Sequence, residues 1–229
     1  MLDTSRVWGL DQFSPTNILG VACKSSRPHE GHHAGIIFVG EDGTFKLLHL
    51  AWHNQLVQES FCLLKDFYDY YWSETSLHNH VKEGVVSLCE AILESYLDGK
   101  MPYGFSNPES AIDPNTGKLN NTVIGLTCAT FVAAVFDSRQ CTIIDLKSWG
   151  GGNLKEDEFY KKIVRIMRNY DHDQYENINN DPNIIGSRIS PLHILSAGTN
   201  KLNNEVPCQS DVLAGVESIL FKIPELRNA

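Results

Sequence analysis

Two apolar segments on either side of a short polar turn constrain the fold more than any other pattern in the chain. Residues 33–40 read His-Ala-Gly-Ile-Ile-Phe-Val-Gly, and residues 44–52 form a second run of mostly apolar side chains. Between them stands Glu41-Asp42-Gly43, a sequence typical of turns. Because β-branched and aromatic residues favour strands, the pattern predicts an antiparallel hairpin.

The length of the turn decides which side chains of this hairpin share a face. A three-residue loop, closed by Gly43 in the left-handed conformation, pairs position 40 with position 44. His33 and His49 then lie diagonally on one face, where two imidazoles can share a hydrogen bond. A two-residue loop would point them to opposite faces. An interaction between the two histidines therefore requires a loop with an odd number of residues, or a bulge that restores the same strand pairing.

The other periodic segments predict an α+β protein. Residues 102–121 and 171–183 are rich in turn-forming or polar residues and are expected to be loop insertions. The chain shows no internal repeat or linker, so residues 1–229 are predicted to form a single domain. Further strands are expected at 18–23 and at 141–146, and the ambiguous segment 55–72 is expected to hold a strand near 56–63 followed by a helix. Helices are also expected at 77–97, 157–170 and 211–221.

Charge and cysteine usage exclude several classes of protein. The net charge of -9, without a basic cluster, argues against nucleic-acid binding. The six cysteines are scattered and form no CxxC motif, which is typical of free thiols in a reducing compartment. No secretion signal stands at the N-terminus, and no stretch approaches the roughly 18 apolar residues of a membrane span. The cytoplasm is therefore the expected location, with signal-independent export left open.

Cys128 stands where a helix is predicted to begin. Thr127 is a suitable N-cap, and the apolar residues that follow form a buried face. A thiolate in the first helical turn is stabilised by the helix dipole, and a nearby imidazole can accept its proton. We therefore interpret Cys128 as a nucleophile and His33 as its base, with the adjacent His32 as the alternative base. The competing interpretation is that Cys128 is only a small buried apolar residue.

Three short motifs resemble the circularly permuted papain-like thiol enzymes, which include the lecithin retinol acyltransferase-like proteins and the permuted relatives of the NlpC cell-wall amidases. The likeness covers residues 29–53 and 124–136. It is carried by His33-Ala34-Gly35-Ile36 with Gly40, by Leu48-His49-Leu50-Ala51, and by Cys128-Ala129-Thr130-Phe131-Val132.

The resemblance implies a fold in which an antiparallel sheet packs against the helix that bears the cysteine. It also implies that Cys128 attacks an acyl carbonyl, that His33 moves the proton, and that His49 orients His33. The expected activity is hydrolysis of an amide, peptide or ester bond through a thioacyl intermediate. An acyltransferase or phospholipase-like enzyme and a non-catalytic binding module remain as alternatives.

Five histidines crowd the hairpin, which raises a zinc-histidine module as a further alternative, since imidazole is the commonest zinc ligand. Adjacent histidines on a strand point to opposite faces, and no cysteine or carboxylate completes a zinc-binding spacing. No metal and no cofactor is therefore expected. The five are His29, His32, His33, His49 and His53.

Overall fold

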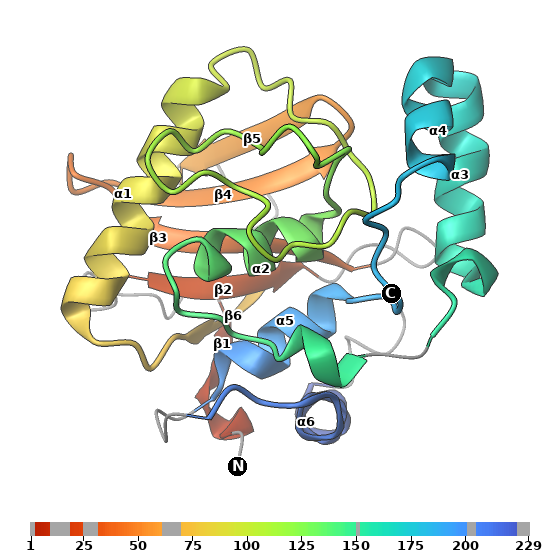
Figure 1. Ribbon diagram of the computed structural model, residues 1–229. Coiled ribbons are helices and arrows are strands. Elements are labelled where there is room, and N and C mark those ends of the chain that lie inside the picture. The colour runs from red at the N-terminus through yellow and green to blue at the C-terminus, as the bar shows by residue number, and fades with distance from the viewer. Residues whose placement is uncertain are drawn as a thin grey trace.

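The protein has an α+β fold in which helices pack on a six-stranded antiparallel sheet (Figure 1). This computed structural model describes residues 3–9, 19–24, 32–60, 70–149, 152–200 and 205–223. The expected fold class, α+β with an antiparallel sheet, is confirmed. No helix in these ranges is both long and apolar enough to cross a membrane.

The sheet has the strand order β1-β6-β2-β3-β4-β5, and all neighbouring strands are antiparallel. The strand predicted at 18–23, both strands of the hairpin and the strand near 56–63 are confirmed. The helix expected after that strand was wrong at residues 70–72, where β6 pairs with β2 instead, and residues 61–69 lie outside the described part of the chain. The strands are β1 Val7–Gly9, β2 Leu19–Lys24, β3 His33–Val39, β4 Phe45–Trp52, β5 Gln55–Ser60 and β6 Tyr70–Glu74.

The three helices predicted at 77–97, 157–170 and 211–221 are confirmed as α1, α3 and α6. Residues 102–121 form turns and isolated bridges, without a helix or strand. Helix α5 was not predicted. The helices are α1 Asn79–Ser95, α2 Cys128–Asp137, α3 Glu158–Tyr170, α4 His172–Asn179, α5 Pro191–Gly198 and α6 Gln209–Lys222.

Two further predicted elements were wrong. The strand expected at 141–146 is absent, and a short 3-10 helix, Leu146–Trp149, follows instead. The Cys141 amide donates to the Phe136 carbonyl, so the backbone there completes the end of α2 rather than joining the sheet.

The loop expected at 171–183 contains α4. Its N-cap is Asp171, whose carboxylate accepts a hydrogen bond from the Gln174 amide at 3.0 Å. Gln174 and Ile178 form the buried face of this helix. Because the polar residue Gln174 occupies one of these buried positions, the segment lacks the apolar periodicity from which a helix would have been predicted.

The two faces of the sheet bury different groups of side chains. Ala34, Ile36 and Phe38 of β3 face the main core, which includes residues of α1 and α2. Ile37 of β3 and Leu47 of β4 belong to a second cluster on the opposite face. In Figure 1, α1, α2 and α5 lie over the face of the main core, while α3 and α4 stand beside the sheet.

Candidate active site

Cys128 is the first residue of α2, and the preceding threonine fixes where that helix begins. The Thr127 hydroxyl accepts a hydrogen bond from the Thr130 amide at 3.1 Å, and the Thr127 amide donates to the Thr130 hydroxyl at 2.8 Å. This reciprocal capping satisfies two backbone donors of the first turn. The predicted helix start at Cys128 is confirmed.

Cys128 is 7% exposed, and its surroundings act on the pKa of its thiol in opposite directions. Burial raises its pKa, because the thiolate loses hydration. The backbone N–H groups of Ala34 and Ala129 point at the sulfur and lower that pKa, as does the charge of Arg188. These donors and this charge would stabilise a thiolate once it forms, although burial holds the resting group protonated.

A tight backbone crossing brings Tyr103 to the start of α2. Residue Tyr103 forms a parallel bridge with Leu126, and the Gly104 amide donates to the Leu126 carbonyl at 3.1 Å. A Cβ atom at Gly125 would lie 2.8 Å from the Gly104 nitrogen, so only glycine fits at this crossing. The Cys128 N–H consequently points at the Tyr103 hydroxyl.

Burial also keeps the Tyr103 hydroxyl protonated, because it raises the pKa of that group well above its usual range. The Tyr103 amide donates to His53 Nδ1 at 3.2 Å, and His53 Nε2 lies 3.2 Å from Asp171 Oδ2. The Tyr103 backbone is thereby anchored to the end of α3.

The hairpin has the three-residue loop that an interaction between His33 and His49 requires. The Gly40 amide donates to the Thr44 carbonyl at 2.9 Å, and Gly43 has a φ of 74°. The paired residues from Val39–Phe45 to Ile36–Leu48 continue the pairing of position 40 with position 44, so the register set by the loop is kept along the hairpin. The predicted register is confirmed.

His33 and His49 form a hydrogen-bonded chain with Glu59. His33 Nε2 lies 2.5 Å from His49 Nδ1, and His49 Nε2 lies 2.8 Å from Glu59 Oε1. A carboxylate only accepts, so a neutral His49 donates from Nε2 to Glu59 and accepts at Nδ1 from His33. The lone pair of His33 is then left on Nδ1. Glu59 was not singled out in the sequence, since its role depends on the pairing of β4 with β5.

The chain formed by His33, His49 and Glu59 lies on the face of the sheet opposite Cys128. Side chains alternate along β3, so His33 shares a face with Ile37, whereas Ala34 shares the face covered by α2. Among the described residues, no hydrogen bond joins Cys128 to either His33 or His49. The two predicted histidines therefore meet each other, and the predicted nucleophile lies across the sheet from them.

Acid should destabilise the fold through His33. Burial, then the charges of His49 and Lys24, lower the pKa of His33 from 6.5 to about 3. An unfolded chain protonates this group first, so its contribution to stability is present above pH 6.5 and is lost as the pH falls toward 3. We expect the unfolding free energy to fall by at most about 1.4 kcal/mol per pH unit from this group. Urea unfolding between pH 7 and pH 4 measures it.

A His33→Gln variant should have a flatter pH dependence, because glutamine does not titrate. His80→Gln, which changes an exposed histidine on α1, is the matched control and should keep the slope of the parent chain. Equal slopes in all three proteins would contradict the assignment of the acid sensitivity to His33.

No group of three or more metal-ligating side chains is present in the described part of the chain. His29, one of the five histidines of the zinc hypothesis, lies outside the described residues. The nitrogens that face each other in the pair of His33 and His49 are already engaged, and His49 also bonds Glu59.

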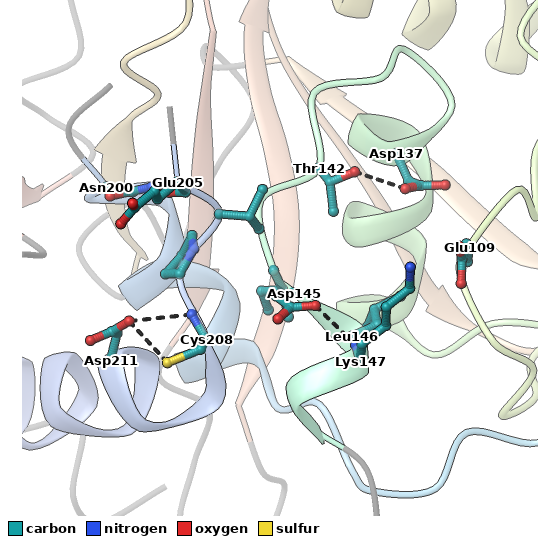
Figure 2. A pocket seen from close by; sticks show the side chains of 13 residues that line it. Glu109, Asp137, Thr142, Asp145, Leu146, Lys147, Asn200, Glu205, Cys208 and Asp211 are labelled. Carbon is teal, nitrogen blue, oxygen red and sulfur yellow. Dashed lines mark hydrogen bonds between the residues drawn. The ribbon is translucent and has the colours of Figure 1, made fainter. Parts of the chain in front are cut away.

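A pocket of about 650 Å³ lies beside the C-terminal end of α2 (Figure 2). It reaches Asp137, the last residue of α2, whereas Cys128 is the first. The carboxylates at its wall include Asp137, which bonds the Thr142 hydroxyl at 2.9 Å, and Asp211, which accepts from the Cys208 amide. None of these residues had been singled out in the sequence.

Comparisons with protein-family models, with curated proteins and with solved structures found no match to this chain.

Proposed function

We propose that the protein is a cysteine-dependent hydrolase that cleaves an amide, peptide or ester bond, with a permuted papain-like arrangement of its site. The observation that carries this proposal is the Cys128 thiol in the first turn of α2, with the N–H groups of Ala34 and Ala129 directed at the sulfur. A helix start and converging backbone donors favour a thiolate and an oxyanion at the same place.

In the proposed reaction the Cys128 thiolate attacks the substrate carbonyl, and a carbon–sulfur bond forms. The tetrahedral oxyanion accepts hydrogen bonds from backbone N–H groups and from the Tyr103 hydroxyl, which retains its proton. The bond to the leaving amine or alcohol breaks as a protonated imidazole supplies a proton to it. Water then attacks the thioester, which releases the acid and restores the thiol.

His32 is the base that best fits this chemistry. It directly precedes β3 and stands two residues before Ala34, whose amide points at the sulfur. If the extended backbone of β3 continues to residue 32, the side chains of His32 and Ala34 share a face about 7 Å apart. The same alternation turns His33 away from Cys128. His33, His49 and Glu59 are then a partly buried polar chain that holds β3, β4 and β5 in register.

Trapping of the acyl-enzyme tests the proposal. The protein is incubated with a panel of amide, ester and thioester acyl donors, quenched in acid, and analysed by intact mass followed by peptide mapping. We expect an increment of one acyl group, located on Cys128. Cys23 and Cys89 are buried and should remain unmodified, because burial raises the pKa of both thiols far above the usual range.

Addition of hydroxylamine should discharge the adduct, as expected of a thioester. An acyl group found only on the partly exposed Cys141 or Cys208, or spread over several residues, would contradict the proposal. Failure of every donor of the panel to acylate Cys128, while a thiol-directed alkylating agent does reach it, would also contradict it.

A further inference from the structure

A second pocket, of about 540 Å³, contains an arginine whose charge reaches the candidate nucleophile. The pocket is lined by the 3-10 helix before residue 150, by the segment before α3, by residues 186–190 and by the starts of α5 and α6. Its volume falls in the range of small-molecule sites. Arg188 lies in its wall and also acts electrostatically on the Cys128 thiol and on the Tyr103 hydroxyl.

The Arg188 guanidinium is held in place by stacking. Its central carbon lies 4.0 Å from the centre of the Phe159 ring. Within the described ranges it donates no hydrogen bond and forms no ion pair. A stacked guanidinium keeps its N–H edges free, and these edges match a carboxylate or phosphate in a bidentate manner.

Other groups of the pocket also favour an anion. The N-cap of α5, Ser190, lines it, so the positive end of that helix dipole lies beside the pocket. The Trp149 indole N–H is buried without a hydrogen-bond partner among the described residues. An indole N–H is a donor only.

Asp157 is the one carboxylate among the described residues of this wall. Its oxygen Oδ1 accepts from the Phe159 amide at 2.8 Å and from the Tyr160 amide at 3.2 Å. The start of α3 therefore offsets its charge. His193, which also lines the pocket, is kept neutral because burial and the charge of Arg188 lower its pKa to about 4.

We propose that this pocket binds a carboxylate of the acyl substrate, with Arg188 as its main ligand and the Trp149 N–H as a further donor. This inference rests on the proposed hydrolase function for the identity of the ligand as a substrate. It adds the substrate class: the preferred amide or peptide carries a carboxylate near the bond that is cleaved. Arg188 is here a specificity-determining residue.

Binding can be measured without turnover. In the Cys128→Ala protein, we would follow the four tryptophan indole N–H signals by ¹H–¹⁵N NMR, with the Trp149 signal assigned through Trp149→Phe. N-acetylglycine serves as the carboxylate probe, N-acetylglycinamide as its neutral counterpart, and inorganic phosphate as a second anion. We expect N-acetylglycine to shift the Trp149 signal saturably and the neutral amide to bind at least about tenfold more weakly.

Arg188→Gln should weaken N-acetylglycine binding by at least about tenfold, whereas Arg188→Lys should retain part of it. Arg165→Gln, on the exposed side of α3, removes the same charge and should leave binding within about twofold, since exposed charges are largely screened. If an Arg188 variant fails to fold, the comparison of N-acetylglycine with N-acetylglycinamide in the Cys128→Ala protein still decides the question.

Four results would overturn the inference. One is that N-acetylglycine leaves the Trp149 signal unchanged at saturating concentration. A second is that N-acetylglycinamide binds as tightly as N-acetylglycine. A third is that the Arg188→Gln protein binds N-acetylglycine as tightly as the protein that keeps Arg188. The last is that phosphate binds more tightly than the carboxylate, which would assign the pocket to phosphate. Because the assay uses Cys128→Ala protein, a failure here is distinguishable from a failure to form an acyl-enzyme.

Discussion

Replacement of Cys128 by alanine is expected to lower the turnover of an acyl donor identified by trapping by at least about 10³-fold, because the covalent intermediate can no longer form. The unfolding free energy should change by about 1 kcal/mol, since only one small buried sulfur is removed. The initial rate at saturating donor and a urea unfolding curve, measured on one preparation, separate the two effects.

Cys141→Ala is the matched control. This cysteine is partly exposed and lies just beyond the other end of α2, and burial together with the charge of Asp137 raises the pKa of its thiol to about 12. The control should keep the turnover of the parent chain. Retention of turnover in Cys128→Ala protein would rule out Cys128 as the nucleophile, whatever the stability.

The hairpin and the start of α2 could be predicted because local chemistry determines both. Gly43 supplies the left-handed residue that a three-residue loop needs, and the loop then fixes the register of β3 against β4. Thr127 precedes an apolar run and caps it. In each case the deciding residues lie within a few positions of the element that they control.

The surroundings of Cys128 could not be predicted, because distant segments supply them. The Tyr103 hydroxyl reaches the Cys128 N–H because of the backbone crossing at Gly125, and Arg188 comes from the segment before α5. Glu59 joins the histidine pair only through the pairing of β5 with β4. No periodicity in the sequence connects these positions.

The choice between the adjacent histidines also depended on tertiary structure. Alternation along an extended backbone predicts that His32 and His33 point to opposite faces, but it does not show which face receives a helix. The face that receives a helix is decided by the packing of α2 against Ala34 and Ile36. The even register brought His33 to His49, as the loop required, and packing then put Cys128 on the other side of the sheet.

Alanine variants of the two histidines should therefore have different effects. We expect His32→Ala to lower the rate of Cys128 acylation at neutral pH by about 10²- to 10⁴-fold, the usual contribution of a general base. The remaining reaction should rise with pH up to the titration of the isolated thiol, whose pKa burial raises. A stopped-flow pH profile of single-turnover acylation measures both the rate and this change of shape.

His33→Ala should instead act on stability. It leaves His49 Nδ1 without the partner that lies 2.5 Å away, and an unsatisfied buried polar group costs about 1–3 kcal/mol. Its acylation rate should stay within a few-fold of the parent chain wherever the protein is folded, and its pH profile should keep the parent shape. The opposite pattern, a lost rate in His33→Ala and a retained one in His32→Ala, would show that the His33 ring reaches the thiol where β3 begins and would return the base role to His33.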